Sequence, residues 1–258
     1  MSDMQNTPAK LLSPDEPSPF ETVNPDGAGE VLLTCEHAGK LLPERVAGLG
    51  LSSDDLERHI GYDIGAAGLA RRLSKVLDAT LVVQRYSRLV IDCNRPAGAK
   101  DLIPEISDST RVPGNMDLSD AERRMRYEEI HQPFHTEIAH QIARKKSRAV
   151  IAVHSFNRTV DQEQRDFHVG LLFNRDSRFA QALRGPIAHE IGIQLVALNR
   201  PYAVEDESDE TIPRHGEATG LLHVLLEVRN DRIRTEEGQR KWAALLSQAI
   251  NEAMAAVS

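Results

Sequence analysis

Chemically reactive side chains follow four aliphatic segments of this sequence, at the point where each segment ends. They are Glu36 and His37 after residues 31–35 (VLLTC), Asn94 and Arg95 after residues 88–93 (RLVIDC), His154 and Ser155 after residues 149–153 (AVIAV), and Glu227 and Arg229 near the end of residues 221–228 (LLHVLLEV). Ligands of open α/β sheets bind outside the carboxyl ends of the strands. If the four segments are strands, the sequence predicts a polar site at one edge of a sheet.

Two of these residues, His37 and His154, are candidate metal ligands. Neutral imidazole is a common zinc ligand, and a catalytic zinc has three protein ligands and one open position. The third ligand would be acidic, and Asp63, Glu36 and Glu44 are the choices. Ordinary interpretations stay open, because loop histidines can simply donate hydrogen bonds and an aspartate before a helix is a favoured N-cap.

Glu227 is a candidate general base, because a carboxylate in an aliphatic strand is costly unless it is paired or functional. It could take a proton from the attacking water and later pass it to the leaving amine. The alternative is an ion pair with Arg229, two positions on and therefore on the same strand face. Arg88 and Arg95 could bind a carboxylate or stabilise an oxyanion, or could be solvated at the surface.

A second histidine pair, His131 and His135, has the i, i+4 spacing of some metal-binding helices. However, position 132 is glutamine, where the H-E-x-x-H motif has glutamate, and Pro133 disturbs the helix between the two histidines. We therefore expect a solvated or packing role for both. A dinucleotide enzyme is also disfavoured, because no G-x-G-x-x-G motif follows the first strand.

The candidate residues must be positioned by short strands that alternate with helices. We expect strands at 31–35, 80–84, 88–93, 149–153, 169–173, 194–198 and 221–228. We expect helices at about 53–77 with a break near Gly61, after Ser119, from Ser177 to Gly192, and after Thr235. Ser119 with Glu122 is a capping-box pattern. Continuous aliphatic strands that alternate with helices predict a three-layer α/β/α sandwich with a mixed, mostly parallel sheet.

The 258 residues are expected to form a loosely ordered N-terminal lead, 1–28, and a single catalytic α/β domain, 29–258. The acidic segment 200–220 is a candidate lid. A net charge of −8 gives no reason to expect nucleic acid or an anionic membrane as partner. Two cysteines, the lack of a signal-peptide pattern, and no run near ~20 apolar residues favour the cytoplasm. The oligomeric state is left open.

Five segments, in this order, resemble the N-formylglutamate amidohydrolase family. They are CEHAG at 35–39, GYDIGA at 61–66, SRLVIDCNRP at 87–96, HSF at 154–156 and LLEVRND at 225–231. The resemblance runs from about Val31 to Ile233. That family is related to zinc carboxypeptidases and to aspartoacylase-like deacylases, so the resemblance implies a zinc carboxypeptidase-like fold.

The resemblance also implies roles for individual residues. His37 and His154 would bind Zn²⁺, or another divalent metal. Relatives commonly have a glutamate ligand three positions after the first histidine, where this chain has Lys40, so Asp63 in the GYDIGA segment is the expected third ligand. Glu227 would be the general base and Arg88 would polarise the scissile carbonyl. The expected substrate contacts are Asn94 and Arg95 as a carboxylate clamp, with Arg229, Tyr202 and His215 as further candidates.

The reaction implied by the resemblance is hydrolysis of N-formyl-L-glutamate to formate and glutamate, a step of histidine degradation, on a small-molecule carboxylate substrate. Two other functions stay open. One is a zinc amidase or carboxypeptidase-like enzyme that acts on another N-acyl amino acid or a short peptide, which substrate profiling would reveal. The other is a non-catalytic α/β protein that uses its arginines to bind a small anion, without turnover and without metal.

Overall fold

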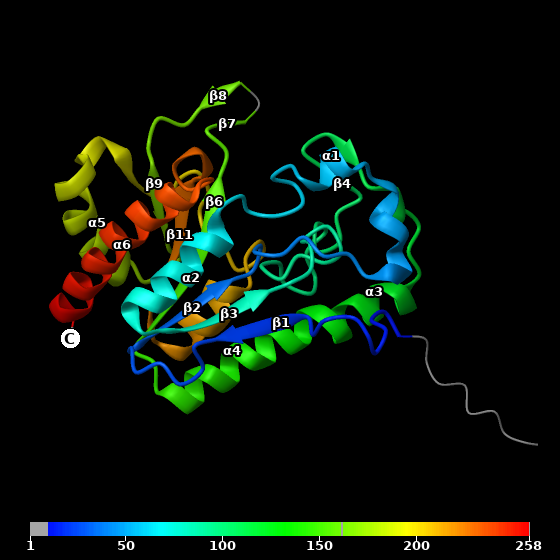
Figure 1. Cartoon of the computed structure of the whole chain (residues 1–258), viewed down its shortest axis with the longest axis horizontal. Helices are drawn as coiled ribbons and strands as arrows, with labels where there is room; N and C mark the ends of the chain where they lie inside the picture. The colour runs from blue at the N-terminus through cyan, green and yellow to red at the C-terminus, as the bar shows by residue number, and fades with distance from the viewer. Residues whose placement is uncertain (1–9, 161, 258) are drawn as a thin grey trace, which may run out of the picture.

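The centre of the protein is a seven-stranded mixed sheet, seen in a computed structural model that describes residues 10–160 and 162–257 (Figure 1). Across the sheet the strands are β1 (Phe20–Val23), β3 (Thr80–Gln84), β2 (Val31–Cys35), β6 (Ala149–Phe156), β11 (Leu222–Arg229), β9 (Val169–Leu172) and β10 (Val196–Leu198). The β1–β3 and β11–β9 pairs are antiparallel, and the other four pairs are parallel. The predicted mixed, mostly parallel sheet is confirmed.

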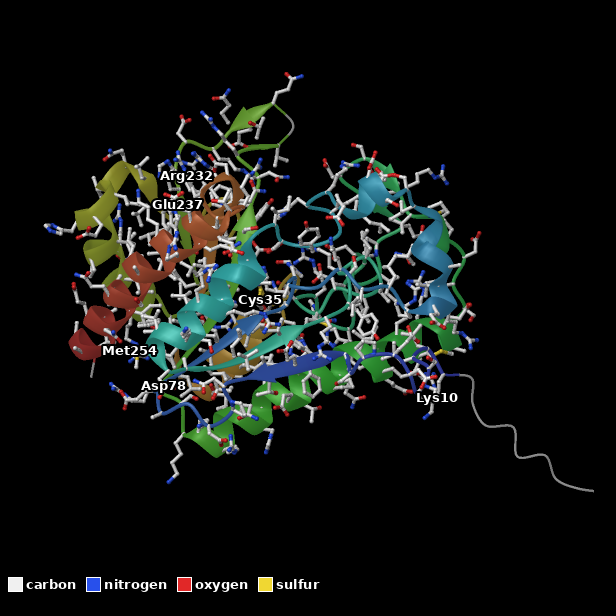
Figure 2. All side chains as sticks on the ribbon, in the orientation of Figure 1. Lys10, Cys35, Asp78, Arg232, Glu237 and Met254 are labelled. Carbon is white, nitrogen blue, oxygen red and sulfur yellow. The ribbon has the colours of Figure 1, made fainter. Side chains whose placement is uncertain are left out.

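Helices cover both faces of this sheet (Figure 1). The longer ones are α2 (Ala66–Leu77), α4 (Gln132–Lys145), α5 (Arg178–Ile191) and α6 (Glu236–Ala256). Successive strand residues point to opposite faces. Leu33 and Leu81 accordingly share a core with α2, α5 and α6, whereas Leu32 and Val82 share one with α4. Figure 2 shows side chains filling both layers, with Cys35 between β2 and α2. The three-layer sandwich is confirmed.

Several helix boundaries follow the expected local signals. Ser119 and Glu122 form a complete capping box at α3 (Asp120–Arg126), and the Thr235 hydroxyl caps α6. Gly192, with a positive φ of 96°, ends α5. Between α3 and α4 the chain makes a π-helical turn (Tyr127–His131), which brings Pro133 into the first turn of α4, where its missing N–H is tolerated. The predicted break near Gly61 is confirmed, since α1 (Ser53–Leu56) ends before it and α2 begins after it.

The predicted strand at 88–93 is wrong. This segment is a loop that folds back on itself, with hydrogen bonds from the Val90 amide to the Ser87 carbonyl and from the Arg95 amide to the Asp92 carbonyl. Its aliphatic side chains are nevertheless buried in the core on the α4 side of the sheet. An aliphatic run reports burial, and burial in a loop gives the same sequence signal as burial in a strand.

The expected N-terminal lead is also wrong for residues 10–28, while residues 1–9 lie outside the described residues. β1 pairs with β3, and Leu11 is buried in the core. The Glu129 carboxylate accepts hydrogen bonds from the amides of Leu11 and Leu12. The first described residues therefore belong to the fold. That residues 29–258 form one catalytic domain stays a prediction.

Two short hairpins lie outside the seven-stranded sheet: β4 (Ile106–Ser107) with β5 (Thr110–Arg111), and β7 (Thr159–Val160) with β8 (Glu163–Gln164). The acidic segment 200–220 contains a second π-helical turn, Ile212–Gly216. Within the part of the chain that the structure describes, no helix combines the length and apolarity needed to cross a bilayer.

Candidate active site

A cavity of about 800 Å³ opens at the carboxyl ends of the central strands. His37 follows β2, His154 lies in β6, and Glu227 lies opposite His154 in the register of β11. Most of the predicted site residues line this cavity: His37, Asp63, Arg88, Asn94, Arg95, His154, Tyr202 and Glu227. Residues that are 190 positions apart in the sequence thus meet because their strands are parallel neighbours.

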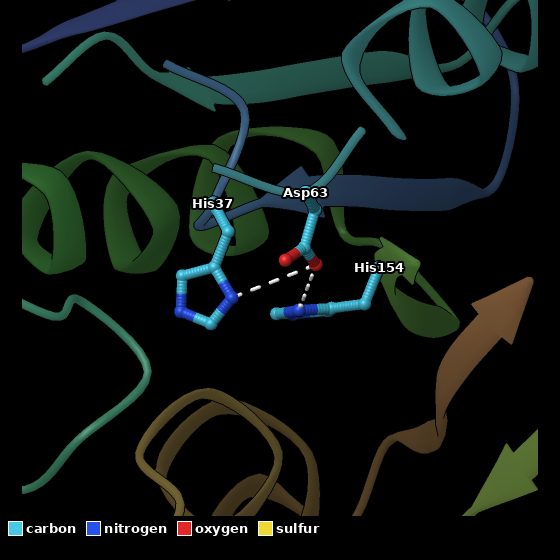
Figure 3. A group of neighbouring side chains, drawn as sticks. All are labelled: His37, Asp63 and His154. Atoms are coloured by element: carbon cyan, nitrogen blue, oxygen red, sulfur yellow. Dashed lines mark hydrogen bonds and ion pairs between the residues drawn. The ribbon is translucent and has the colours of Figure 1, made fainter. Parts of the chain in front are cut away.

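Two imidazoles and one carboxylate converge at the base of the cavity (Figure 3). The ring centroids of His37 and His154 are 4.7 Å apart. Asp63 Oδ2 is 3.0 Å from Nδ1 of His154 and 3.6 Å from Nδ1 of His37, and one ligand atom from each residue lies within 4.8 Å of the others. All three side chains are buried. The spacing fits a shared cation.

Nε2 of each imidazole contacts a carboxylate that lies outside this group, a different one for each ring. Nε2 of His37 is 2.6 Å from Asp92 Oδ1, and Nε2 of His154 is 2.8 Å from Glu36 Oε2. If Nε2–H donates to the carboxylate in both rings, each Nδ1 can offer a lone pair to a cation at the centre of the group; in His154 this Nδ1 lies 3.0 Å from Asp63 Oδ2, to which it donates when the ring is doubly protonated. Histidines that bind metal in proteins commonly have this arrangement, which fixes the tautomer and raises ligand basicity.

Burial and charge together control ionisation in this cluster. Burial opposes the charge on Asp63, but the imidazoles of His37 and His154 hold the pKa of the carboxyl well below its usual range. Burial likewise opposes the charge on Asp92, but Arg88 and His37 keep its pKa well below normal. Against the effect of burial, hydrogen bonds to Asp63 and Glu36 raise the pKa of His154 well above its ordinary value. The carboxylates are therefore ionised at neutral pH.

The residues present fit a bound divalent metal. Among the described residues, the buried atoms His37 Nδ1 and Asp63 Oδ1 lack a hydrogen-bond partner. Two imidazole nitrogens and a carboxylate oxygen are a common ligand set for catalytic zinc. Lys40 instead forms an exposed ion pair with Glu57, on the outside of the protein. Asp63 does not act as the N-cap of α2, since that position belongs to Gly65.

Glu227 stands at the cavity with a carboxylate that the protein leaves largely unpaired. The residue is 6% exposed, and Oε2 has no hydrogen-bond partner within the described part of the chain. Burial raises the pKa of Glu227 to about 8. The alternative of an ion pair with Arg229 is wrong, because the Arg229 guanidinium binds Asp231 and carbonyl oxygens of residues 165–167. A carboxyl group with a pKa near neutrality is suited to general-base work.

Hydrogen bonds to other groups of the protein fix the side chains of Arg88, Asn94 and Arg95. Arg88 donates two hydrogen bonds to Asp92 Oδ2, at 3.0 and 2.6 Å. The Asn94 amide donates to Asp209 Oδ1 at 2.9 Å and accepts from the Thr211 amide. Arg95 donates to Asp101 and to a backbone carbonyl of the acidic segment. These side chains line the cavity, but many of their polar atoms already have protein partners.

Two predicted substrate contacts are not brought to the cavity. Arg229 is buried against the loop at 165–167, and neither it nor His215 is among the described residues that line the cavity. His215 Nε2 is 3.0 Å from Nδ1 of His135, whose Nε2 donates to the Cys93 carbonyl, and His131 is hydrogen-bonded to the Arg95 carbonyl. All three histidines are buried. His131 and His135 are thus not solvated. Their hydrogen bonds to the carbonyls of Arg95 and Cys93 hold the loop that carries Asn94.

Sequence reasoning missed Asp92 and His59. Asp92 supports His37 and Arg88, and an acidic residue in the otherwise apolar run 89–93 was the available signal. His59 lines the cavity, with Nδ1 3.8 Å from Asp63 Oδ1, and burial lowers its pKa. Glu36, which was also a candidate third ligand, contacts Nε2 of His154 instead.

Comparison with known proteins gives consistent matches. The family model described as N-formylglutamate amidohydrolase matches residues 29–234. The solved structure of gene product Atu2144 from Agrobacterium tumefaciens is 36% identical, with a TM-score of 0.91 over 96% of this chain and 99% of that chain. An N-formylglutamate amidohydrolase from Ralstonia eutropha shares the fold at 18% identity, with a TM-score of 0.66 over 92% of this chain and 98% of that chain. No curated protein sequence matches.

The family model and the cavity agree on one class of protein: an enzyme that hydrolyses amide carbon–nitrogen bonds. The non-catalytic interpretation is thereby set aside. Since the family model covers most of the sequence, the chain belongs to the N-formylglutamate amidohydrolase family, and the predicted resemblance is confirmed.

Proposed function

We propose that this chain hydrolyses N-formyl-L-glutamate to formate and glutamate, with a divalent metal, zinc by preference, held by His37, Asp63 and His154. The observation that carries the proposal is the convergence of these three buried side chains next to Glu227. The family to which the chain belongs supports the substrate. The arginines at the cavity support a substrate that bears carboxylates.

When bound, the metal would polarise the scissile carbonyl as a Lewis acid and lower the pKa of a water molecule. Glu227 acts as the general base, since it takes the proton of the attacking water and delivers it to the leaving amine. Arg88 stabilises the oxyanion that develops on the carbonyl. Because Asp92 holds the Arg88 guanidinium through two hydrogen bonds, this cation is oriented before the substrate arrives.

Asn94 and Arg95 hold a substrate carboxylate in this proposal. Their present partners, Asp209 and the carbonyl of Ser208, belong to the acidic segment 200–220. A substrate carboxylate would therefore exchange with contacts of that segment, which supports its role as a lid. The exchange of one carboxylate for another at Asn94 keeps the number of hydrogen bonds similar, so lid opening need not cost much free energy.

Metal analysis combined with formate release tests this proposal. We expect a divalent metal in the purified protein, loss of turnover after chelation, and recovery with Zn²⁺. Asp63→Asn should lose both metal and activity, whereas Glu44→Gln, which alters the exposed carboxylate also considered as a ligand, should retain both. Full turnover by a metal-free preparation would exclude the metal mechanism. If the metal-loaded protein hydrolysed other acyl compounds but not N-formyl-L-glutamate, the proposed substrate would be excluded.

A second candidate substrate class is favoured by the size of the cavity. A volume of about 800 Å³ lies in the upper part of the range for sites that enclose drug-sized ligands, and N-formyl-L-glutamate is much smaller. The cavity also extends to the β4–β5 hairpin at Ser107 and to the β7–β8 hairpin at Thr159. An N-acyl amino acid with a longer acyl group, or a short peptide, would use this space. Rates for a series of acyl lengths on glutamate would distinguish the two.

A further inference from the structure

His59 lies in the wall of the cavity, and its side chain forms no hydrogen bond with residues 10–160 and 162–257. Its side chain is 21% exposed, and its Nδ1 is a buried atom without a partner in that part of the chain. The other histidines at or behind the cavity are all hydrogen-bonded to the protein: His37, His131, His135, His154 and His215. The polar atoms of His59 are therefore available to a substrate.

The turn that carries His59 is fixed by hydrogen bonds around it. His59 lies four residues before Asp63, between α1 and α2. The Asp63 amide donates to the His37 carbonyl at 2.8 Å, and the Ser87 hydroxyl donates to the Gly61 carbonyl at 2.7 Å. The same turn thus presents Asp63 to the candidate metal site and His59 to the cavity wall.

The surroundings of the ring determine which nitrogen of His59 carries the proton. Nδ1 lies 3.8 Å from Asp63 Oδ1, a buried oxygen that also lacks a hydrogen-bond partner within the described part of the chain. A carboxylate oxygen attracts an N–H and repels a nitrogen lone pair, so the proton belongs on Nδ1. Arg88 Nη1 lies 3.6 Å from the same oxygen, and its charge, like that of a bound metal, opposes a second proton on the ring. Nε2 is then a hydrogen-bond acceptor.

This acceptor opens to the cavity and matches one group of the substrate. Nε2 is not among the buried atoms without a partner, and the residues that the structure describes give it no hydrogen bond, so the exposed part of the ring includes Nε2. An N-acyl amino acid with ionised carboxylates has a single hydrogen-bond donor, its amide N–H, because its carbonyl and carboxylate oxygens only accept. The acceptor at His59 and the donor of the substrate therefore correspond one to one.

We propose that His59 is a substrate-binding residue whose Nε2 accepts the N–H of the scissile amide, while its Nδ1–H faces Asp63. This inference rests on the proposed function for its substrate class, but the contact itself is argued from the imidazole at the cavity wall. The contact orients the amide, because it holds the N–H while the carbonyl oxygen lies at the cation site and Arg88. It also selects secondary amides over tertiary amides, which have no N–H.

Two compounds test the contact: N-formyl-L-glutamate and N-formyl-N-methyl-L-glutamate, which has no amide N–H. The side chain of His59→Asn ends near the position of Nδ1 and leaves no acceptor at the position of Nε2. In this variant, kcat/KM for N-formyl-L-glutamate should fall roughly 2- to 12-fold, the range for one hydrogen bond between neutral groups. For the N-methyl compound it should stay the same or rise, because no contact is lost. Equal losses for both compounds, or no loss for the first, would overturn the proposal.

His59→Gln separates the substrate contact from a structural support of Asp63. The glutamine side chain extends to the position of Nε2, where its carbonyl can accept the N–H, so this variant should keep most of kcat/KM for N-formyl-L-glutamate. A support of Asp63 alone would give the reverse order, because asparagine places a donor near the position of Nδ1 and glutamine does not. Zinc affinity in a chelator competition is the second readout. It should be nearly the same in His59→Asn as in the wild type, and a parallel loss of zinc affinity and turnover would overturn the contact.

His140→Asn is the matched control. His140 also faces a carboxylate, with Nδ1 3.4 Å from Glu137 Oε2, but its side chain is 61% exposed and it is not among the described residues that line the cavity. This variant should leave kcat/KM for both compounds unchanged. A loss as large as that of His59→Asn, again confined to N-formyl-L-glutamate, would show that the effect does not come from the cavity wall and would overturn the proposal.

Failure of the contact and failure of the proposed reaction give different results. If N-formyl-L-glutamate is hydrolysed but His59→Asn lowers kcat/KM equally for both compounds, the reaction stands and the contact is wrong. If the compound is not hydrolysed, it stays intact, and calorimetry decides. Binding to His59→Asn that is weaker by roughly 2- to 12-fold for N-formyl-L-glutamate, and unchanged for the N-methyl compound, leaves the contact standing without the reaction. Equal binding of N-formyl-L-glutamate to wild type and variant, or no binding to either, overturns the contact.

Discussion

Replacement of Glu227 by glutamine should change how the stability of the metal-free protein depends on pH. Burial raises the pKa of Glu227 to about 8, from an ordinary value of 4.5. Because the folded state favours the protonated form, this group reduces stability as the pH rises. The loss begins near pH 4.5, where the unfolded chain ionises, and levels off above pH 8, where the folded protein ionises too.

The magnitude follows from the size of the pKa difference. One pKa unit corresponds to about 1.4 kcal/mol, so the wild type should lose about 4 kcal/mol of unfolding free energy between pH 5 and pH 9 through this group alone. Glutamine has the same shape and does not titrate in this range. Groups such as Asp63 and His154 titrate in both proteins, so the difference between the two curves isolates Glu227.

Urea denaturation of chelator-treated wild type and Glu227→Gln, at pH 5, 7 and 9, measures this difference. The variant should gain on the wild type as the pH rises, with most of the gain complete by pH 8. In the presence of Zn²⁺ the gap should narrow, because a nearby cation favours the ionised carboxylate. Parallel stability curves for the two proteins would show that Glu227 is not held protonated by burial, and would remove the physical basis of its role as base.

Three other predictions concern the support of the site and the fold. Asp92→Asn should weaken zinc affinity about 10- to 100-fold in a chelator competition, because Asp92 fixes the His37 ring; unchanged affinity would contradict this. Arg88→Ala should lower kcat for amide hydrolysis about 10²- to 10³-fold with a smaller effect on KM, and a pure KM effect would assign it to ground-state binding. Thr235→Ala should lower the unfolding free energy by about 1 kcal/mol, measured in urea, through loss of the α6 cap.

Much of the fold was accessible from the sequence because the central strands are buried on both faces. Every residue of β2, β3, β6, β9 and β11 is buried, so each strand contains a mostly aliphatic run, with polar residues gathered mainly near the strand ends. The same signal failed at 88–93, where a loop is buried by its neighbours instead of by strand pairing. It also failed at β1, an edge strand of partly exposed residues, whose place in the sheet depends on its partner β3.

The site was predictable to the extent that it depends on strand ends. His37, His154 and Glu227 follow or end central strands, and parallel pairing brings such residues to one edge. The supporting contacts were not predictable, because they depend on which loop folds against which strand. Asp92 reaches His37 across 55 positions of sequence, and Glu36 reaches His154 across 118. No local pattern encodes either contact.

The charges around the cavity also suggest how a substrate would be oriented. The strand ends of β2 and β11 and the turn at Asp63 contribute carboxylates, and Glu36, Asp63 and Glu227 are all buried there. The loop at 88–96 contributes guanidiniums, with Arg95 outside the strands and at the wall of the cavity. A dicarboxylate substrate is repelled by the first group and attracted by the second. We therefore expect the acyl carbonyl to face the strand ends, next to the cation site and Glu227, while the carboxylates face the loops. Reversal of this charge, with Arg95→Glu, should then abolish binding of the dicarboxylate glutarate in calorimetry, and undiminished binding would refute this orientation.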